Sequence, residues 1–253
     1  MTHLRMIVMG VIALGVWTGA VALGDEPRSK TRPDAEAVRI PISPGHELAG
    51  FVHRPIKGNA VAAVLAPGSA GVDESVLRKV ADGLAEVGFL AIRFDWAFIT
   101  AQGEPSKGLS AERAELDAVI KWGRTQGGIK KIVLVGKSFG SRLVLARADR
   151  SGDDLAGIAL LNLPIHSENP PEGVVEEAEL LMTQTVPSVV IAAERCSRGD
   201  LKLLYVLGRN SNIVAVPGDE LFQEGASNDV RTSANIDLVA RAVAAWLRRF
   251  TGT

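Results

Sequence analysis

The sequence of 253 residues contains a single cysteine, Cys196, so no disulfide can form within the chain. Its formal net charge is −1, and basic residues are scattered along the sequence rather than gathered in runs. Neither nucleic acid nor an anionic membrane surface is therefore expected as a partner. Hydrophobic residues make up 47% of the chain, which is enough to bury one sizeable core.

Histidine is also scarce: the four present are His3, His46, His53 and His166. They lie too far apart to combine with carboxylates at metal-ligand spacing, so we expect no metal and no cofactor. His46 and His53 flank an expected antiparallel strand pair, where we expect both to be solvated. No histidine follows His166, which limits the choice of general bases in the second half of the chain.

The N-terminus has the pattern of a secretory signal peptide. Residues 1–5 are short and basic, residues 6–23 are apolar, and a polar run follows. We expect residues 1–24 to be the signal peptide, with cleavage after Ala22 or Gly24, and the protein to be exported to the periplasm or the cell exterior. If the segment stays uncleaved, residues 6–23 are long enough to anchor the protein in a membrane.

The remainder predicts a linker at residues 25–37 and one domain at residues 38–253, without internal repeats. Short apolar runs alternate with amphipathic stretches, which predicts strands alternating with helices. The expected strands are Val38–Ile42, Glu47–Val52, Gly58–Gly68, Phe89–Trp96, Lys131–Gly136, Ala156–Pro164, Val186–Glu194 and Ser211–Gly218. The expected helices are Ser75–Gly88, Ser110–Gly128, Ser138–Arg150, Gly173–Gln184, Asp200–Leu207 and Ser233–Phe250. This alternation indicates an α/β fold, with a mostly parallel sheet covered by helices on both faces.

The third of these helices follows its strand through the segment "LVGKSFGSR". Ser138 stands between Gly136 and Gly140, directly after the strand, which is the setting of a nucleophile elbow. Phe139 then supplies a helix N-terminal N–H group that can stabilise an oxyanion. A phosphate-binding loop is excluded, because Lys131 stands where that motif needs glycine. A tight turn with glycines for packing alone is the remaining alternative.

The segments "VLAPGSAG", "IRFDWAF" and "LVGKSFGSR" resemble the α/β-hydrolase superfamily over Val61–Phe250. The resemblance is to the branch with the testis-expressed hydrolase-like proteins and a subunit of the nonspecific-lethal acetyltransferase complex, near dienelactone-hydrolase-like enzymes. It implies the α/β-hydrolase fold and a serine hydrolase of small ester or acyl substrates. It also implies that Ser138 is the nucleophile, with main-chain N–H groups near Ser69 and at Phe139 as the oxyanion hole.

The sequence departs from this family pattern at both partners of the nucleophile. "AAERCSRGD" places Cys196 where the family has its catalytic acid, and "PGDELFQ" places Glu220, after Asp219, where it has its histidine. Pro67 likewise replaces the histidine that opens the family's oxyanion loop. Cys196 and Asp219 are expected to line the pocket.

Three residues could compensate for the missing partners. Glu220 could act as the base, although a carboxylate is a weak base at neutral pH. His166, at the carboxyl end of its strand, could be the base or a pocket-lining residue. Asp200 could replace the acid or cap the following helix.

Two functions therefore stay open. The first is a serine hydrolase with a remodelled triad, in which Ser138 is the nucleophile and Glu220 or His166 is an unconventional base, acting on a small ester or acyl substrate. The second is a non-catalytic hydrolase-fold protein that binds a small molecule or a protein partner in the same pocket. The loops Asp95–Leu109 and Ser167–Gly173 are expected to roof this pocket. Ser110 is expected to be the N-cap of the helix that carries Glu112 and Glu115 near its start.

Overall fold

The computed structural model describes residues 35–69, 71, 75–150, 155–165, 174–197, 199–224 and 230–250. All of them fall within one compact unit, Pro33–Thr253. The segment expected to be a signal peptide lies outside the described residues, so export stays a prediction. Among the helices that the structure describes, none is both long and apolar enough to cross a membrane.

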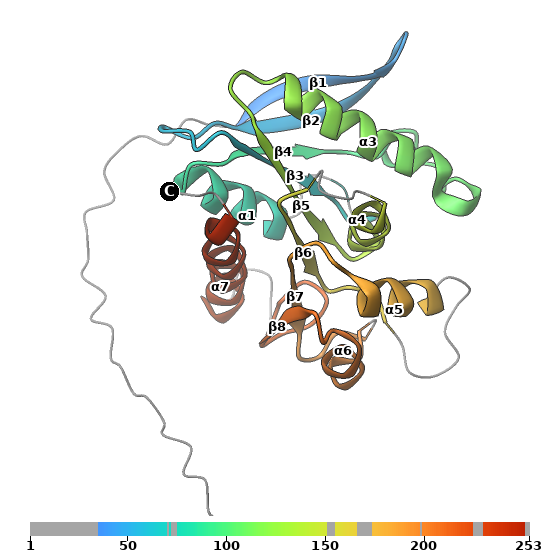
Figure 1. Cartoon of the computed structure of the whole chain (residues 1–253), viewed down its shortest axis with the longest axis vertical. Coiled ribbons are helices and arrows are strands. Elements are labelled where there is room, and N and C mark those ends of the chain that lie inside the picture. Colours follow the sequence, from blue (N-terminus) through green and yellow to red (C-terminus); the bar gives the residue numbers. More distant parts are fainter. Residues whose placement is uncertain are drawn as a thin grey trace, which may run out of the picture. The chain divides into compact units, whose positions relative to one another are not determined.

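The described strands form a single mixed sheet (Figure 1). The strands are β1 (Glu36–Ser43), β2 (His46–His53), β3 (Val61–Ala66), β4 (Leu90–Phe94), β5 (Lys131–Lys137), β6 (Gly157–Leu161), β7 (Ser188–Ala193) and β8 (Ser211–Val216). Their order across the sheet is β1-β2-β4-β3-β5-β6-β7-β8. β2 pairs antiparallel with both β1 and β4, and the remaining neighbours are parallel. The mostly parallel sheet expected from the sequence is confirmed.

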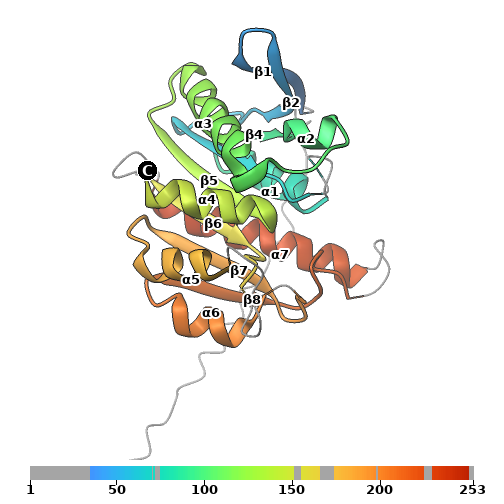
Figure 2. The ribbon, with the colours of Figure 1, turned by 90° about the vertical axis from the view of Figure 1, so that its right-hand side faces the viewer.

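Helices cover both faces of this sheet (Figures 1 and 2). They are α1 (Ser75–Glu86), α2 (Ala97–Thr100), α3 (Ser110–Thr125), α4 (Phe139–Asp149), α5 (Val174–Thr183), α6 (Leu201–Leu207) and α7 (Val230–Leu247), with 3₁₀ turns at Lys107–Leu109 and Arg248–Phe250. α1 and α7 pack on one face, whereas α3, α4, α5 and α6 pack on the other. The sheet is therefore the middle of three layers.

Side-chain alternation along the central strands divides the core between the two faces. In β3 (Val61–Ala66) every residue is buried. Ala62 and Val64 belong to the core under α3–α6, and Ala63 and Leu65 to the core under α1 and α7. A strand buried on both sides has no polar position to expose, which explains the continuous apolar runs in the sequence.

His53 differs from the expectation of a solvated edge residue, whereas His46 is exposed as expected. His53 is buried, and its Nδ1 lies 2.8 Å from Oδ1 of Asp82 in α1. Arg93 in β4 donates from Nε to His53 Nε2 at 3.0 Å, so Nδ1 carries the proton that Asp82 accepts. The prediction was wrong because α1 covers this end of β2. β4 and β3 separate it from β5, so this cluster is remote from Ser138.

The start of α3 is held by residues of the preceding loop rather than by Ser110. The N-cap is Leu109, in a left-handed conformation without a side-chain cap, so that prediction was wrong. The Ser106 hydroxyl instead accepts from the Ala111 N–H at 3.1 Å. Glu112 accepts from both the main-chain N–H (2.8 Å) and the hydroxyl (2.5 Å) of Ser106. These bonds tie the loop before α3 to the first turn of the helix.

Glu115 holds the start of α2 in the same way. Its Oε2 accepts from the main-chain N–H of Ala97 at 3.1 Å, and the side chain is buried. Burial raises the pKa of Glu115 above its ordinary value of 4.5, and the nearby Glu112 adds to this, while the hydrogen bond from Ala97 opposes it. The native state therefore binds this proton more tightly than the unfolded chain does.

We expect the free energy of unfolding of Glu115→Gln, measured relative to that of the natural chain, to increase as the pH rises. The stability that the raised pKa supplies is fully present below the pKa of Glu115 in the unfolded chain. It is lost as the pH rises through the pKa of Glu115 in the folded chain. Glutamine keeps an oxygen for the Ala97 N–H but does not ionise. Urea unfolding of both proteins from about pH 4 to about pH 8 measures the difference. Glu104→Gln, at an exposed position, is the control, and an equally flat difference for both variants would contradict the expectation.

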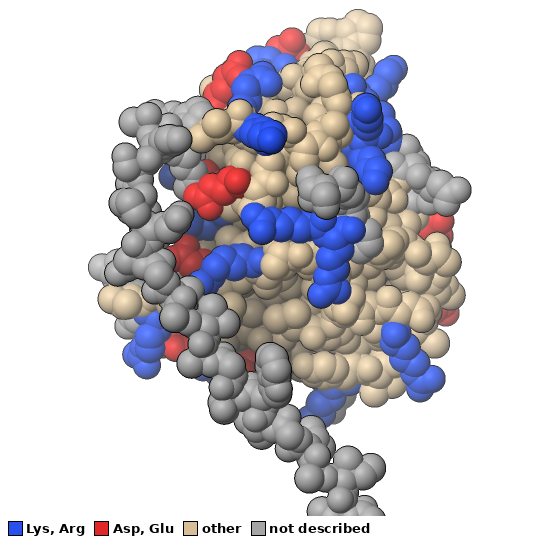
Figure 3. Space-filling view, turned by 60° about the vertical axis from the view of Figure 1, so that its left-hand side comes forward, with Lys and Arg blue, Asp and Glu red and all other residues tan. Residues whose placement is uncertain are grey.

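Charged side chains are dispersed over the face of the molecule seen in Figure 3. On the face seen in Figure 3, Lys and Arg lie in several separate groups, with Asp and Glu among them. One pair joins the two helices of one layer, with Lys79 Nζ in α1 lying 3.2 Å from Asp237 Oδ1 in α7. Exposed pairs of this kind contribute up to about 1 kcal/mol.

Candidate functional site

Ser138 connects the end of β5 to the start of α4. Its backbone angles are φ 49° and ψ −114°, a region that residues with a side chain rarely adopt. Such a conformation costs about 1–3 kcal/mol and persists only where its surroundings enforce it. Its N–H donates to the Leu161 carbonyl of β6 at 2.8 Å, and its carbonyl accepts from the Ser141 hydroxyl at 2.5 Å. The strand–serine–helix turn expected from the sequence is present.

Two glycines allow this turn to pack against neighbouring backbone. A Cβ on Gly136 would lie 2.5 Å from the Cα of Ser141. A Cβ on Gly140 would lie 2.2 Å from the Ala66 carbonyl oxygen and 2.6 Å from that of Pro67. Real Cβ atoms do not approach backbone this closely, so both positions require glycine. The glycines therefore serve packing, but packing alone does not require a strained serine between them.

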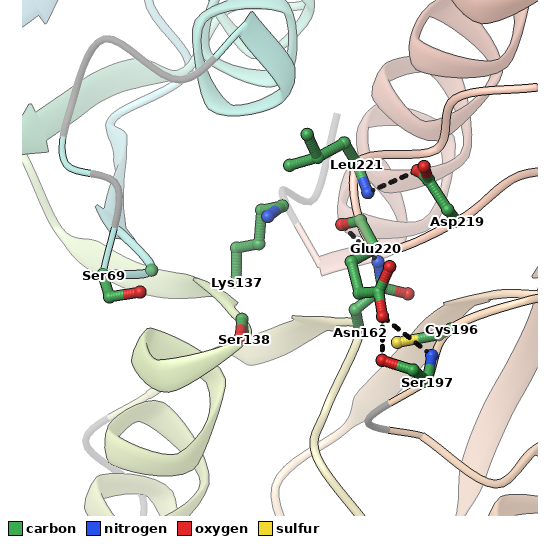
Figure 4. Close-up of a pocket in the computed structure, with 10 residues that line it drawn as sticks. Ser69, Lys137, Ser138, Asn162, Cys196, Ser197, Asp219, Glu220 and Leu221 are labelled. Carbon is green, nitrogen blue, oxygen red and sulfur yellow. Dashed lines mark hydrogen bonds between the residues drawn. The ribbon is translucent and has the colours of Figure 1, made fainter. Parts of the chain in front are cut away.

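A pocket of about 360 Å³ opens beside Ser138 (Figure 4). The residues that line it are Gly68, Ser69, Lys137, Ser138, Asn162, Cys196, Ser197, Asp219, Glu220 and Leu221. They follow the carboxyl ends of β3, β5, β6, β7 and β8, or end a strand themselves, which is the edge where open α/β sheets bind ligands. The volume suits a small ligand. The structure thus brings Ser69, Cys196, Asp219 and Glu220 together with Ser138, as the sequence predicted.

One of the two segments expected to form the oxyanion hole lines the pocket, and the other directly follows Ser138 in the chain. Gly68 and Ser69 line the pocket after β3, and Phe139 opens α4, where N–H groups lack partners within the helix. The buried Trp96 fixes the two segments: its Nε1 donates to the Pro67 carbonyl at 2.9 Å, and its ring contacts Phe139 edge-on at 5.9 Å between centroids. These segments are therefore held firmly enough to present fixed main-chain donors.

Glu220 lies in the pocket but is bonded to a residue other than Ser138. Its Oε1 accepts from the Ser197 N–H at 2.9 Å and from the Ser197 hydroxyl. Figure 4 shows the carboxylate directed towards Cys196 and Ser197, on the opposite side from Ser138. Within the described part of the chain, no hydrogen bond joins the Ser138 hydroxyl to another group.

Comparison with known proteins identifies the architecture. The model of the alpha/beta hydrolase domain family matches residues 59–248, most of the chain. The chain belongs to this family. No curated protein matches it in sequence.

Solved structures of similar fold include serine hydrolases and esterases of low sequence identity. A serine hydrolase without a lid from Xanthomonas campestris is 18% identical, with a TM-score of 0.67 over 90% of this chain and 99% of that one. Est1E from Butyrivibrio proteoclasticus is 15% identical, with a TM-score of 0.66 over 86% and 99%. Dienelactone hydrolase from Anabaena variabilis is 16% identical, with a TM-score of 0.65 over 87% and 99%. These likenesses confirm the α/β-hydrolase fold, while the proposed branch within the superfamily stays a prediction.

Asp219, which lines the pocket, and Asp200 have local structural roles. Asp219 caps its own turn, accepting from the N–H groups of Leu221 (2.9 Å) and Gln223 (3.0 Å). Asp200 caps α6, accepting from the N–H groups of the second and third residues after it at 2.9 and 3.1 Å. The N-cap reading of Asp200 is confirmed, and these bonds direct its carboxylate into the helix end.

Other residues that the sequence predicts at the pocket either do not line it or are not among the described residues. His166 and the loop Ser167–Gly173 are not among the described residues, so their roles stay predictions. The loop Asp95–Leu109 contributes none of the residues lining the pocket, so its expected role as a roof is wrong. The reason is the anchoring by Glu112 and Glu115, which holds this loop against the start of α3. No group of three metal-binding side chains occurs among the described residues.

Two residues that line the pocket, Asn162 and Lys137, were not predicted from the sequence. Asn162 is 3% exposed and has φ 48°; its Oδ1 accepts from the Ala193 N–H at 2.7 Å and its Nδ2 donates to the Glu220 carbonyl at 3.0 Å. Lys137 is 4% exposed, and Figure 4 shows its side chain between Ser69 and Leu221. Each is a polar residue at or just after the end of a buried strand, and this sequence pattern could have identified both.

Proposed function

We propose that this α/β-hydrolase-fold protein is a serine hydrolase of small ester or acyl substrates, with Ser138 as nucleophile. The observation that carries the proposal is the strained serine at the edge of the pocket. Glycine would adopt φ 49° and ψ −114° at no steric cost and would serve the packing equally well. A serine that keeps a costly conformation beside a pocket is best explained by use of its hydroxyl.

The arrangement supports the following chemistry. The substrate carbonyl oxygen binds the N–H groups at Phe139 and the loop that carries Ser69. Ser138 Oγ bonds to the carbonyl carbon, its proton passes through a water to the Glu220 carboxylate, and the leaving group departs with that proton. Water then hydrolyses the acyl-serine by the reverse proton path. The position of Glu220 in the same pocket supports its role as base.

One observation favours a second candidate function. The Glu220 carboxylate is bonded to Ser197, and within the described residues the Ser138 hydroxyl has no hydrogen-bond partner. Without a base in contact, a serine hydroxyl is a poor nucleophile. The second candidate is therefore a non-catalytic protein that binds a small molecule or a protein partner in this pocket without turnover.

Labelling with a fluorophosphonate, which bonds covalently to activated serines, distinguishes the two. On the hydrolase proposal, the purified chain is labelled from acidic to neutral pH, because a carboxylate base stays ionised at lower pH than histidine does. Glu220→Gln is expected to lower the labelling rate about 100-fold, the usual cost of a lost general base. Glu194→Gln, an exposed residue in the turn after β7, is the matched control and should leave the rate unchanged. Absence of labelling at every pH would favour the non-catalytic function.

A further inference from the structure

Ser197 contacts Glu220 although the two residues belong to different turns of the sheet edge. Ser197 lies in the turn after β7, and Glu220 in the turn after β8. The main-chain N–H of Ser197 donates to Glu220 Oε1 at 2.9 Å, and its hydroxyl donates to the same oxygen. The carboxylate is therefore held by two donors from one residue across the pocket rim (Figure 4).

The main chain of Glu220 is fixed independently. Asn162 Nδ2 donates to the Glu220 carbonyl at 3.0 Å. The Asp219 carboxylate holds the same turn by accepting from the Leu221 N–H at 2.9 Å. These bonds fix the backbone, and the two bonds donated by Ser197 hold the Glu220 carboxylate towards the turn after β7.

We propose that Ser197 is a positioning residue that orients the Glu220 carboxylate and thereby sets the pH range over which Ser138 reacts. Hydrogen bonds donated to a carboxylate favour its ionised form, so Ser197 keeps Glu220 ionised to lower pH. The effect on Ser138 rests on the proposed hydrolase function. The effect on the ionisation of Glu220 does not depend on catalysis.

The ionisation of Glu220 can be measured without activity. The full chain is labelled with ¹³C-carboxyl glutamate, and the Glu220 signal is assigned by its loss in Glu220→Gln. In Ser197→Ala, which removes the hydroxyl and keeps the N–H, the titration midpoint of Glu220 is expected to rise by about half a pH unit. Ser197→Thr keeps the hydroxyl and should restore the natural midpoint. Ser43→Ala, at an exposed position in the β1–β2 hairpin, is the control.

The rate of fluorophosphonate labelling against pH is then measured on the same proteins. A base acts when deprotonated, so the labelling rate rises with pH through the Glu220 midpoint. The profile of Ser197→Ala is expected to move to higher pH by the same shift as the carbon signal. The profile of Ser197→Thr is expected to coincide with that of the natural chain.

The two measurements separate the failure of this proposal from failure of the proposed function. An unchanged Glu220 midpoint in Ser197→Ala overturns the role of Ser197, whatever the labelling shows. A shifted midpoint in a chain that is never labelled supports the control of Glu220 by Ser197 and overturns the hydrolase function. A shifted midpoint with an unmoved labelling profile overturns the link from Ser197 to Ser138.

Discussion

Replacing Ser138 by alanine is expected to abolish covalent labelling by a fluorophosphonate and to reduce hydrolysis of short nitrophenyl esters by at least about 1,000-fold. Alanine removes the hydroxyl that bonds to the substrate carbonyl but retains a side chain of similar size at this position. The oxyanion-hole segments at Ser69 and Phe139 do not depend on that hydroxyl, because Trp96 holds them. The loss would therefore report on the nucleophile itself. Mass spectrometry of the intact chain gives the labelled fraction directly.

Ser138→Gly provides a second variant for the same prediction. It also lacks the hydroxyl, and it relieves the strained φ of 49°, so we expect no labelling and a gain of about 1 kcal/mol in the free energy of unfolding. Loss of activity together with a gain in stability would show that the strain is retained for function. Labelling that persists in both variants would place the nucleophile elsewhere in the chain and contradict the proposal.

Replacing Gly140 by alanine is expected to destabilise the fold by about 3 kcal/mol or more. The added Cβ would lie 2.2 Å and 2.6 Å from the carbonyl oxygens of Ala66 and Pro67. Both contacts are with backbone, which cannot rotate away as a flexible side chain can. Relief of the clash requires α4 to move from the end of β3, which also displaces Ser138. Urea unfolding at neutral pH measures the change, and thermal unfolding gives an independent estimate.

Gly127→Ala is the matched control, because no atom lies within 4 Å of its added Cβ and its φ is not in the left-handed region. We expect it to change the free energy of unfolding by less than about 0.5 kcal/mol. An equal effect of the two substitutions would show that the backbone at the end of β3 adapts readily to Gly140→Ala. The close approach of α4 to β3 would then not be what enforces the strained serine.

The order of strands and helices could be predicted because each element has its own pattern of apolar residues within a short stretch of sequence. Each central strand is a continuous apolar run, such as Val61–Ala66, since both of its faces are buried in the sheet. The turn at Ser138 is equally local, since the glycines on either side of it, Gly136 and Gly140, are the positions where a Cβ would clash with neighbouring backbone. The environment of His53 could not be predicted, because α1 comes to cover it only when β2 and β4 pair.

The sequence by itself determined the α/β-hydrolase fold, the position of Ser138 at the end of a strand, and the absence of any histidine after His166. Tertiary structure decided which groups meet in the pocket. Glu220 bonds to Ser197, 23 residues away in sequence, and to Asn162, 58 residues away. The loop expected to roof the pocket is instead held against α3. These outcomes depend on contacts between segments that are distant in the chain. The spacing of residues within one segment does not determine such contacts.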